Sequence, residues 1–564
     1  MYSRTRSLFI AILCILMCTA VFAQSGNSTT GSISGRVTDS SGGALPGVTL
    51  TATNLDTGQT RTDVSAANGD YSFNLLQTGR YRVDAELSGL GKASSPALTV
   101  VLGSTTRADI KLSPQVTESI TVTAGAPIVD TQKSGMTASV SNRQIENLPL
   151  LGRDFKSLAA LTPGITTGAF DTTSITANGA RPLSTDYNID GASSNNDFFG
   201  QQTGGTNPPF TFSQAAIKEF QVIRTQYDAE YGRGVGATVN AITKSGTNDI
   251  DGEAFYFLRK KAWASSRPGT IGGLIVSDSF RSKESSQPGF AVGGPVVRDK
   301  IFFFANFDGQ HQKLPIAITG TSNMLNSTNF NALSAANQAA VLAKIQANAG
   351  GSYASGLNYD QTFNDSTYLL KFDGNLGSKN HWSFRDNVTK FTKANSQGIT
   401  VLGLNQTQEV DKFYQAVVEG DTVFSSNLYN QFIGQSGRDQ RPVTALGTGT
   451  EFSLNWGSNQ FFGANDITPN TADEKKFQVK DTVQYVWKNQ TIKIGGELLH
   501  RNLFDSFPRF AGGMYTFTNL ANFLSNTANT FQQASGINNG DVAWKTNLWG
   551  YFINDSFHIG SRLT

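Results

Sequence analysis

The chain has 564 residues, of which only 16% are charged while 38 are Phe, so it has fewer charges and more aromatic side chains than an ordinary cytosolic protein. A formal net charge of +2 excludes recognition of nucleic acid through a strongly basic surface. Both cysteines, Cys14 and Cys18, lie close to the N-terminus. The remainder has no thiol that could mispair in an oxidising compartment.

The first residues have the three parts of a cleavable secretory signal. Arg4 and Arg6 precede an apolar run at 8–17, and Val21-Phe22-Ala23 follows it. We therefore predict a signal peptide over residues 1–23, cleaved after Ala23. Beyond it, no run approaches the roughly 20 consecutive apolar residues of a membrane-spanning helix. A membrane protein with this sequence would have to span with strands, and a soluble periplasmic or secreted protein remains open at this point.

Residues 31–113 contain seven short strand-like runs separated by Gly, Pro, Asn and Asp. Their spacing of about 8 to 12 residues predicts a seven-stranded, Ig-like β-sandwich. Tyr71, Phe73 and Leu75 alternate with polar neighbours, so one face of that strand is expected to be buried. The runs GRVTDSSGGALPGVTLTATNLDTGQT and NGDYSFNLLQTGRYRVDAEL resemble the carboxypeptidase-regulatory-like domain, whose fold is grouped with carbohydrate-binding sandwiches. Sugar binding by this domain therefore stays an alternative to a purely structural role.

The name of that domain raises the question of an enzyme. A zinc carboxypeptidase needs a His-x-x-Glu pair and a third His to hold its metal. The histidines of the chain all lie outside residues 31–113, and none is followed by Glu three positions later: His311, His381, His500 and His558. We predict no enzymatic activity, no cofactor and no metal site.

Residues 130–247 predict a small α+β domain. Ser141 to Gln144 forms an S-x-x-Q capping box, and a second helix is expected over 150–162, capped by Asp154. The segment IKEFQVIRTQYDAEYGRGVGATVNAITKSGT at 217–247 closely resembles the last third of the plug of Oar-type TonB-dependent outer-membrane receptors. Its glycine run at 231–236 lies between two strand-like runs, which argues against a dinucleotide-binding loop.

Residues 116–124, between the two domains, resemble a TonB box. A periplasmic partner that adds this segment as an edge strand needs β-favouring residues and no proline within its grip. A plain linker strand is the alternative. The residues expected in the box are Glu118, Ser119, Ile120, Thr121, Val122, Thr123 and Ala124.

Four charged residues of the plug-like region are candidates for salt bridges that latch the plug to the barrel wall, with a solvated loop as the alternative. They are Arg153, Arg181, Glu230 and Arg233.

Residues 248–564 contain ten strand-like runs joined by alternately short and long connections, the pattern of periplasmic turns and extracellular loops in an antiparallel transmembrane β-barrel. Apolar Phe477, Val483 and Tyr485 alternate with polar Gln478 and Gln484, so one face can meet lipid and the other a wet lumen. A short helix is expected at 334–349 in the longest loop. The ten runs are 252–260, 289–297, 301–311, 366–377, 380–392, 410–424, 427–437, 475–487, 491–500 and 544–559.

A barrel that holds a folded plug has about 22 strands. Ten runs predict an incomplete barrel and hence the N-terminal part of a longer, mainly β receptor. The resemblance implies transport of an external oligosaccharide, siderophore or peptide across the bacterial outer membrane, driven by TonB with ExbB and ExbD, with the sandwich and TonB box on the periplasmic side. The partners would be TonB and outer-membrane lipid, with no nucleic acid. The alternative is a surface binding or adhesion protein that recognises glycan or protein without import.

Overall fold

The computed structural model describes residues 29–113, 137–148, 153–167, 175–181, 184–196, 201–202, 210–224, 228–263, 270–271, 274–275, 284–317, 331–349, 358–394, 407–446, 450–455, 459–487, 490–534 and 540–557. The predicted signal peptide (1–23) and TonB box (116–124) lie outside these residues. None of the helices in the described part of the chain is both long and apolar enough to cross a bilayer.

The N-terminal domain, called the sandwich from here on, is built from two small sheets, ordered β4-β1-β8 with β9 on β1, and β3-β2-β5-β6 with β7 on β5. Tyr71, Phe73 and Leu75 are buried, as their alternation predicts. The strands are β1 Gly31–Thr38, β2 Thr49–Asn54, β3 Thr60–Val64, β4 Asp70–Leu76, β5 Gly79–Leu87, β6 Gly91–Ser94, β7 Leu98–Val100, β8 Thr105–Arg107 and β9 Ile110–Lys111.

The prediction of seven strands in the sandwich is wrong, because the domain has nine. The short, mostly exposed β6 carries little apolar signal. The last predicted run splits into β8 and β9 where Ala108 crosses β1 at Gly35. A Cβ on Gly35 would lie 1.8 Å from the Ala108 carbonyl oxygen, so only glycine permits this close crossing.

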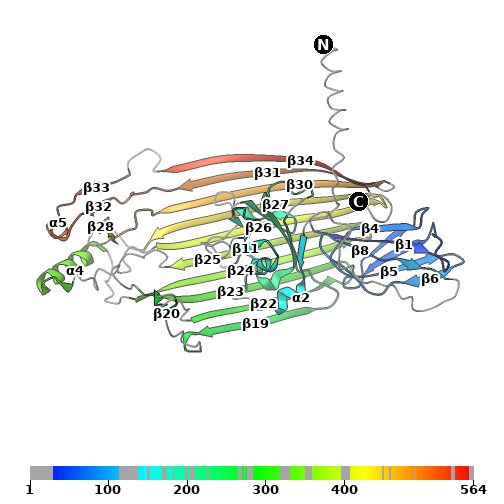
Figure 1. Ribbon diagram of the computed structural model, residues 1–564, viewed down its shortest axis with the longest axis horizontal. Helices are drawn as coiled ribbons and strands as arrows, with labels where there is room; N and C mark the ends of the chain where they lie inside the picture. The colour runs from blue at the N-terminus through cyan, green and yellow to red at the C-terminus, as the bar shows by residue number, and fades with distance from the viewer. Residues whose placement is uncertain are drawn as a thin grey trace, which may run out of the picture.

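A second domain, residues 137–247, lies against the large sheet described below and is called the inner domain (Figure 1). Its sheet has the order β10-β17-β18-β13-β14. Its elements are β10 Thr137–Val140, α2 Asn142–Asn147, η1 Phe155–Leu161, β11 Ile165–Thr167, β12 Ile175–Ala177, β13 Thr185–Ile189, β14 Ala192–Ser193, β15 Asn195–Asn196, β16 Gln201–Gln202, η3 Gln214–Ala216, β17 Ile217–Ile223 and β18 Ala237–Thr243.

The helices of the inner domain follow their capping residues. The backbone N–H of Ser141 donates to Gln144 Oε1 at 2.9 Å, which confirms the capping box of α2. Asp154 caps the second helix as predicted by accepting from the Lys156 backbone N–H at 3.1 Å. That helix is a 3-10 helix that begins only at Phe155, since Arg153 has φ of 55°, a left-handed conformation that no helix continues through.

The ten predicted strands of residues 248–564 form one antiparallel sheet in the order β19-β22-β23-β24-β25-β26-β27-β30-β31-β34. Figure 1 shows these strands running side by side, with the sandwich at the end where the tight turns lie. Their bounds are β19 Asp251–Lys260, β22 Glu284–Val297, β23 Ile301–Ala317, β24 Asn358–Leu376, β25 Asn380–Ala394, β26 Thr407–Ser425, β27 Leu428–Ala445, β30 Asn470–Trp487, β31 Gln490–Ser506 and β34 Asp541–Phe557.

Several strands are longer than predicted. The ladder between β23 and β24 continues to the pair Ala317 and Asn358, although the sequence alternation fades near residue 366. Backbone hydrogen bonds extend the hairpin into polar sequence, where side-chain patterning no longer indicates a strand.

The loops opposite the tight turns fold against one another. The predicted loop helix is present as α4 (Ala335–Ala349), and β28 (Glu451–Asn455) pairs in parallel with β32 (Met514–Phe517), a strand from a different loop. Val341, Leu454 and Phe523 share a small apolar core there. The remaining elements are η4 Lys261–Trp263, β20 Thr270–Ile271, β21 Leu274–Ile275, β29 Asn459–Phe462, α5 Leu520–Leu524 and β33 Thr530–Gln532.

Candidate functional site

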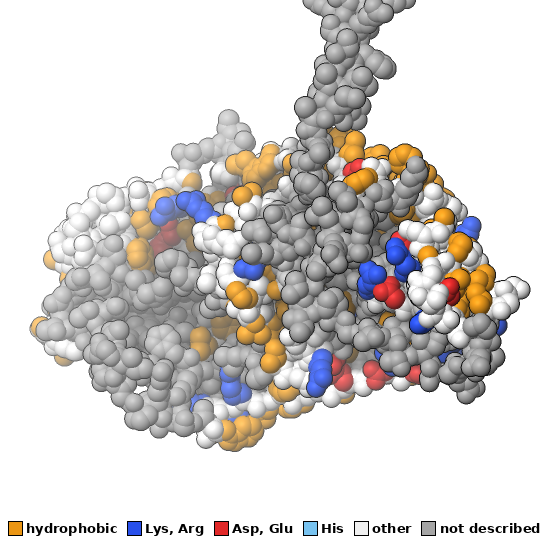
Figure 2. All heavy atoms as spheres, turned by 45° about the vertical axis from the view of Figure 1, so that its right-hand side comes forward, with side chains coloured by type: hydrophobic (Ala, Val, Ile, Leu, Met, Phe, Trp, Pro, Cys, Tyr) orange, Lys and Arg blue, Asp and Glu red, His pale blue; other side chains and the backbone are white. Residues whose placement is uncertain are grey.

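The large sheet has many polar side chains buried and many aromatic side chains exposed. In β30, Phe477 is 48% exposed and Tyr485 40%, whereas Gln478 and Gln484 are almost completely buried. Apolar side chains also lie along the flank of the molecule in the space-filling view (Figure 2). A soluble sheet that packs one face on a core shows the opposite distribution, so the outer face of this sheet is suited to lipid.

The inner domain packs on the polar face of the large sheet. Its buried residues share an apolar cluster with Ala291, Phe304, Leu369 and Phe413 of the sheet. Hydrogen bonds between the inner domain and the large sheet accompany this cluster. The Ser193 backbone N–H donates to Gln478 Oε1 at 2.9 Å, and the Gln435 side-chain amide donates to the Ser193 carbonyl, also at 2.9 Å.

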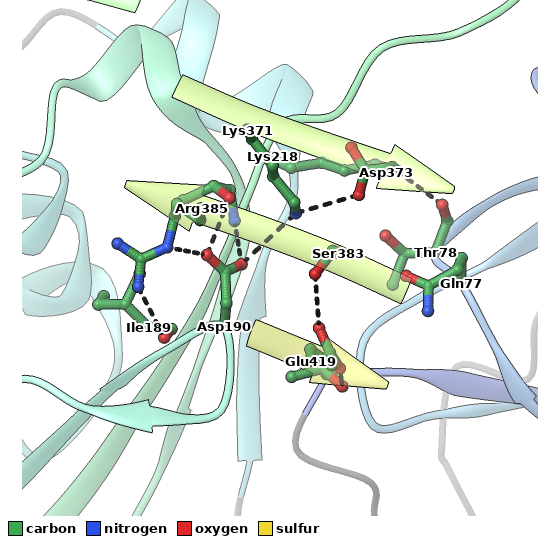
Figure 3. Close-up of polar contacts among 12 residues, drawn as sticks. Gln77, Thr78, Ile189, Asp190, Lys218, Lys371, Asp373, Ser383, Arg385 and Glu419 are labelled. Atoms are coloured by element: carbon green, nitrogen blue, oxygen red, sulfur yellow. Dashed lines mark hydrogen bonds and ion pairs between the residues drawn. The ribbon is translucent and has the colours of Figure 1, made fainter. Parts of the chain in front are cut away.

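The strongest polar contact between the two units is an ion cluster around Asp190, in the turn after β13 (Figure 3). Arg385 Nε lies 2.6 Å from Asp190 Oδ2, and Lys371 Nζ lies 3.8 Å from Asp190 Oδ1. Thr243 donates its backbone N–H and its hydroxyl to the same carboxylate, at 2.8 and 2.9 Å. The guanidinium of Arg385 also lies over the ring of Phe212, 5.1 Å from its centroid.

The cluster sets two cations against two carboxylates, because Lys371 Nζ also lies 3.8 Å from Asp373 Oδ1. Burial alone would raise the pKa of the Asp190 carboxyl, but Lys371, Arg385 and the two hydrogen bonds from Thr243 together hold that pKa below its usual value. Asp190 is therefore ionised at neutral pH and pairs with two buried cations of the large sheet. Removing one partner of such a cluster leaves an uncompensated buried charge.

The family comparisons agree with this inside-out sheet. The profile of the outer membrane beta barrel domain matches residues 242–564, more than half of the chain. The chain belongs to this outer-membrane barrel family. A second profile, the carboxypeptidase regulatory-like domain, matches residues 32–113. The large sheet is accordingly called the barrel wall from here on.

The chain is similar to the TonB-dependent transporter Oar of Myxococcus xanthus, with 27% identity over 312 residues that make up 52% of this chain. The match spans 27% of that relative's length. The suspected resemblance to Oar-type proteins is thus confirmed.

A solved outer-membrane transporter shows the same fold. The outer membrane transporter YddB from Escherichia coli is 11% identical, with a TM-score of 0.53 over 74% of this chain and 54% of that chain. FpvA of Pseudomonas aeruginosa, solved with heterologous pyoverdines, has a TM-score of 0.48 at 11% identity, over 76% of this chain and 50% of that chain.

Three of the four predicted latch residues contact the barrel wall. Arg153 lies over the rings of Phe255 and Phe257 of β19, at 4.4 and 4.8 Å from their centroids. Burial lowers its pKa, although the guanidinium remains charged.

The other two of these residues contact β31. Arg233 Nη2 lies 3.4 Å from Glu497 Oε1, and Glu230 Oε2 lies 3.8 Å from Nζ of the fully buried Lys493. Arg181 is exposed. The structure thus brings Arg153, Glu230 and Arg233 to the wall, while the side chain of Arg181 points into solvent.

Sequence reasoning missed the central cluster of Asp190, Lys371 and Arg385. Lys371 and Arg385 could be recognised as charged residues at lumen-facing positions of strands whose polar and apolar side chains alternate. Asp190 could be recognised as an acidic residue directly after a buried strand. Nothing in the sequence pairs Asp190 with either cation, because more than 180 positions separate it from both.

A polar cavity lies where the sandwich, the inner domain and the barrel wall meet. Its volume is about 710 Å³, part of which is open to solvent. Its lining includes Asp56 and Gln77 of the sandwich, Lys218 of the inner domain, and Lys371 and Glu419 of the wall. Among the described residues, no group of three or more His, Cys, Asp or Glu side chains is placed to hold a metal ion.

Proposed function

We propose that this protein is a TonB-dependent outer-membrane transporter, in which the inner domain is the plug and residues 116–124 are the TonB box. The observation that carries the proposal is the folded domain on the polar face of an outer-membrane barrel wall, held by the Asp190 cluster. The likeness to the Oar transporter supports it.

The mechanism follows from the kind of contact between plug and wall. The plug is held by ion pairs, amide hydrogen bonds and a modest apolar cluster rather than by a continuous core. Such contacts have defined geometry and are lost together when the domain shifts by a few ångströms, because hydrogen bonds weaken steeply with distance and angle. A pull on the TonB box would move the plug and open the lumen to an external solute without any chemical step.

Arg153, Glu230 and Arg233 act in this proposal as latches between plug and wall. Their partners lie on β19 and β31, near opposite edges of the ten-stranded sheet, so they hold the plug at two separated places. Arg181, being exposed, has no part in the latch. The solute class stays open among oligosaccharide, siderophore and peptide.

A binding experiment tests the proposal. A peptide of residues 118–124 and the full chain in detergent are each titrated with the C-terminal domain of TonB from the same bacterium by calorimetry. We expect both to bind, and a peptide with Val122→Pro to bind at least tenfold more weakly, because proline removes a backbone donor from an added strand. No binding by either form would reject TonB dependence.

The surface-adhesion alternative draws support from one feature, the folded assembly of α4, α5, β28 and β32 on the loop side. In that case the full chain would bind a glycan or protein on cells, yet show no affinity for the TonB domain.

A further inference from the structure

One strand of the plug holds the sandwich through three side-chain contacts. On β17, Lys218 Nζ donates to the Thr78 carbonyl at 2.6 Å, and Glu219 Oε1 accepts from the Leu102 backbone N–H at 3.2 Å. The side-chain amide of Gln221 donates to the Leu102 carbonyl. Two backbone segments of the sandwich are thus gripped by side chains of a single plug strand (Figure 3 shows Lys218 and Thr78).

The same sandwich also holds the barrel wall. Gln77 Nε2 donates to Asp421 Oδ2 of β26 at 2.9 Å. The hydroxyl of Thr29 donates to Glu419 of β26 and accepts from Gln431 Nε2 of β27 at 2.8 Å. Gln77 is half-buried and the other side chains in these contacts are buried, so their polar atoms would lose their partners if the sandwich moved away without water entering.

We propose that the docked sandwich is a brake on the plug, an inference that rests on the proposed function. Because the sandwich bonds to the plug and to the wall at once, the plug cannot move relative to the wall unless one of these two sets of contacts breaks. The surface formed by β17 and the barrel wall is thus an intramolecular docking site, and its partner is the sandwich of the same chain.

The length of the connecting chain places the sandwich under the same pull as the plug. Glu118 is only five positions after Ser113, the last described residue of the sandwich. Five extended residues span at most about 17 Å. A pull that moves the TonB box farther than this from Ser113 therefore exerts force on the sandwich. The hydrogen bonds that dock the sandwich must then break before the plug can move farther.

A covalent lock tests the brake. A Cβ on Gly58 of the sandwich would lie 3.1 Å from Asp299 Cγ in the turn between β22 and β23. Asp299 Cγ occupies the position that a cysteine sulfur would take, and in a disulfide the Cβ of one cysteine lies roughly 3 Å from the sulfur of the other, so the two positions are within reach of a disulfide. Because the only cysteines are Cys14 and Cys18, within the predicted signal peptide, the pair Gly58→Cys with Asp299→Cys forms a single defined bond.

The first readout is amide hydrogen exchange of the β17 peptide in the full chain, reconstituted in lipid nanodiscs. Fixing the sandwich to the wall raises its effective concentration at β17, so we expect exchange to slow by at least about tenfold in the oxidised protein. The reduced form of the same protein controls for folding, and each single cysteine variant controls for the substitution.

A second pair of variants tests whether the disulfide slows exchange through the contacts of the sandwich with β17. Lys218→Ala with Gln221→Ala removes two of the three contacts and should abolish the effect of the lock. The matched control is Lys92→Ala, an exposed lysine of the sandwich paired only with Glu86 at the surface. It should leave the effect of the lock intact.

In cells, the yield of the spontaneous disulfide reports docking directly. We expect the cross-linked fraction to rise when the proton gradient is collapsed by an uncoupler or when TonB is deleted, because the pull that undocks the sandwich is then absent. Equal exchange in oxidised and reduced protein, or equal cross-linking with and without TonB, would overturn the brake. Either result would leave the TonB titration unaffected, whereas failure of that titration would reject the proposed function itself.

Discussion

Asp190 Oδ2 lies 2.6 Å from Arg385 Nε, with Asp190 in the turn after strand β13 of the inner domain and Arg385 on the inner face of the barrel wall. Both side chains are almost completely buried. In the proposed function, movement of the plug would separate these two buried charges, which is costly because a buried charge that loses its partner is not compensated by water. It also gives the first prediction.

Asp190→Asn should destabilise the seating of the plug by about 3 to 5 kcal/mol, since Arg385 then remains buried without its carboxylate and Lys371 loses one of its carboxylate partners. Hydrogen exchange of β13 and β18 in the reconstituted full chain measures the change. The matched control is Asp84→Asn, which removes a solvent-exposed pair with Arg82 and should cost no more than about 1 kcal/mol. Equal effects of the two substitutions would show that the Asp190 cluster does not hold the plug.

The latch residues should separate into two groups. Arg153→Ala removes the contact with two rings of β19 and should loosen the neighbouring wall contact by about 0.5 to 2 kcal/mol. Arg233→Ala should act in the same direction through the loss of Glu497. Arg181→Ala, an exposed control, should have no effect. Limited proteolysis of the plug in intact outer membranes ranks the three, and an effect of Arg181→Ala equal to the others would argue against the latch.

Docking of the sandwich should strengthen as the pH falls from 7 towards 4.5. Burial raises the pKa of Glu219 above its ordinary 4.5, so the docked form binds the proton more tightly than the undocked form. The stabilisation of docking that comes from protonating Glu219 is complete below pH 4.5 and is lost as the pH rises through the raised pKa.

The measurement is the pH dependence of β17 exchange, with Glu219→Gln as its control. That variant keeps an oxygen for the Leu102 backbone N–H but has no proton to titrate. Its β17 exchange, corrected for the intrinsic pH dependence of amide exchange, should therefore be flatter than that of the natural chain. A parallel slope in both proteins would assign the pH response to other groups.

Burial lowers the pKa of the neighbouring Lys218, which weakens its charged form in the docked state. This lysine contributes its full stability only above 10.5 and loses it as the pH falls through the lowered pKa. Lys218→Gln should consequently remove any alkaline component of the docking profile. Exchange of β17 between pH 8 and 10 checks this result.

A charged side chain introduced on the outward face of the wall should destabilise the sheet in lipid. Val483→Arg places a guanidinium on the exposed face of β30 and should destabilise the sheet in lipid by about 2 to 4 kcal/mol if residue 483 lies near the bilayer centre. Ser378→Arg, in an exposed turn between β24 and β25, is the control and should be neutral. Urea unfolding in lipid vesicles compares them, and equal midpoints would place the face of Val483 outside the membrane.

Local patterns were sufficient for much of the fold. Alternation of Phe477 with Gln478 and Tyr485 with Gln484 indicated a wall with one wet and one lipid-facing side, because the side chains of a strand alternate between its faces whatever lies beyond it. The caps of α2 and η1 were readable from Ser141, Gln144 and Asp154, since a cap is made within a few residues. The number of strands in the sandwich could not be read from the sequence, because the split between β8 and β9 depends on how Ala108 crosses Gly35.

What the sequence determined by itself was therefore periodicity, caps and turns, together with the resemblance to a known family. Only the tertiary structure decided that Asp190 meets Arg385, and that β17 grips the sandwich through Lys218 and Gln221. The physical reason is that a charged residue at a lumen-facing position is compatible with many partners. Which partner it meets is fixed by strand register and by the seating of one domain against another, and neither is encoded within a local stretch of chain.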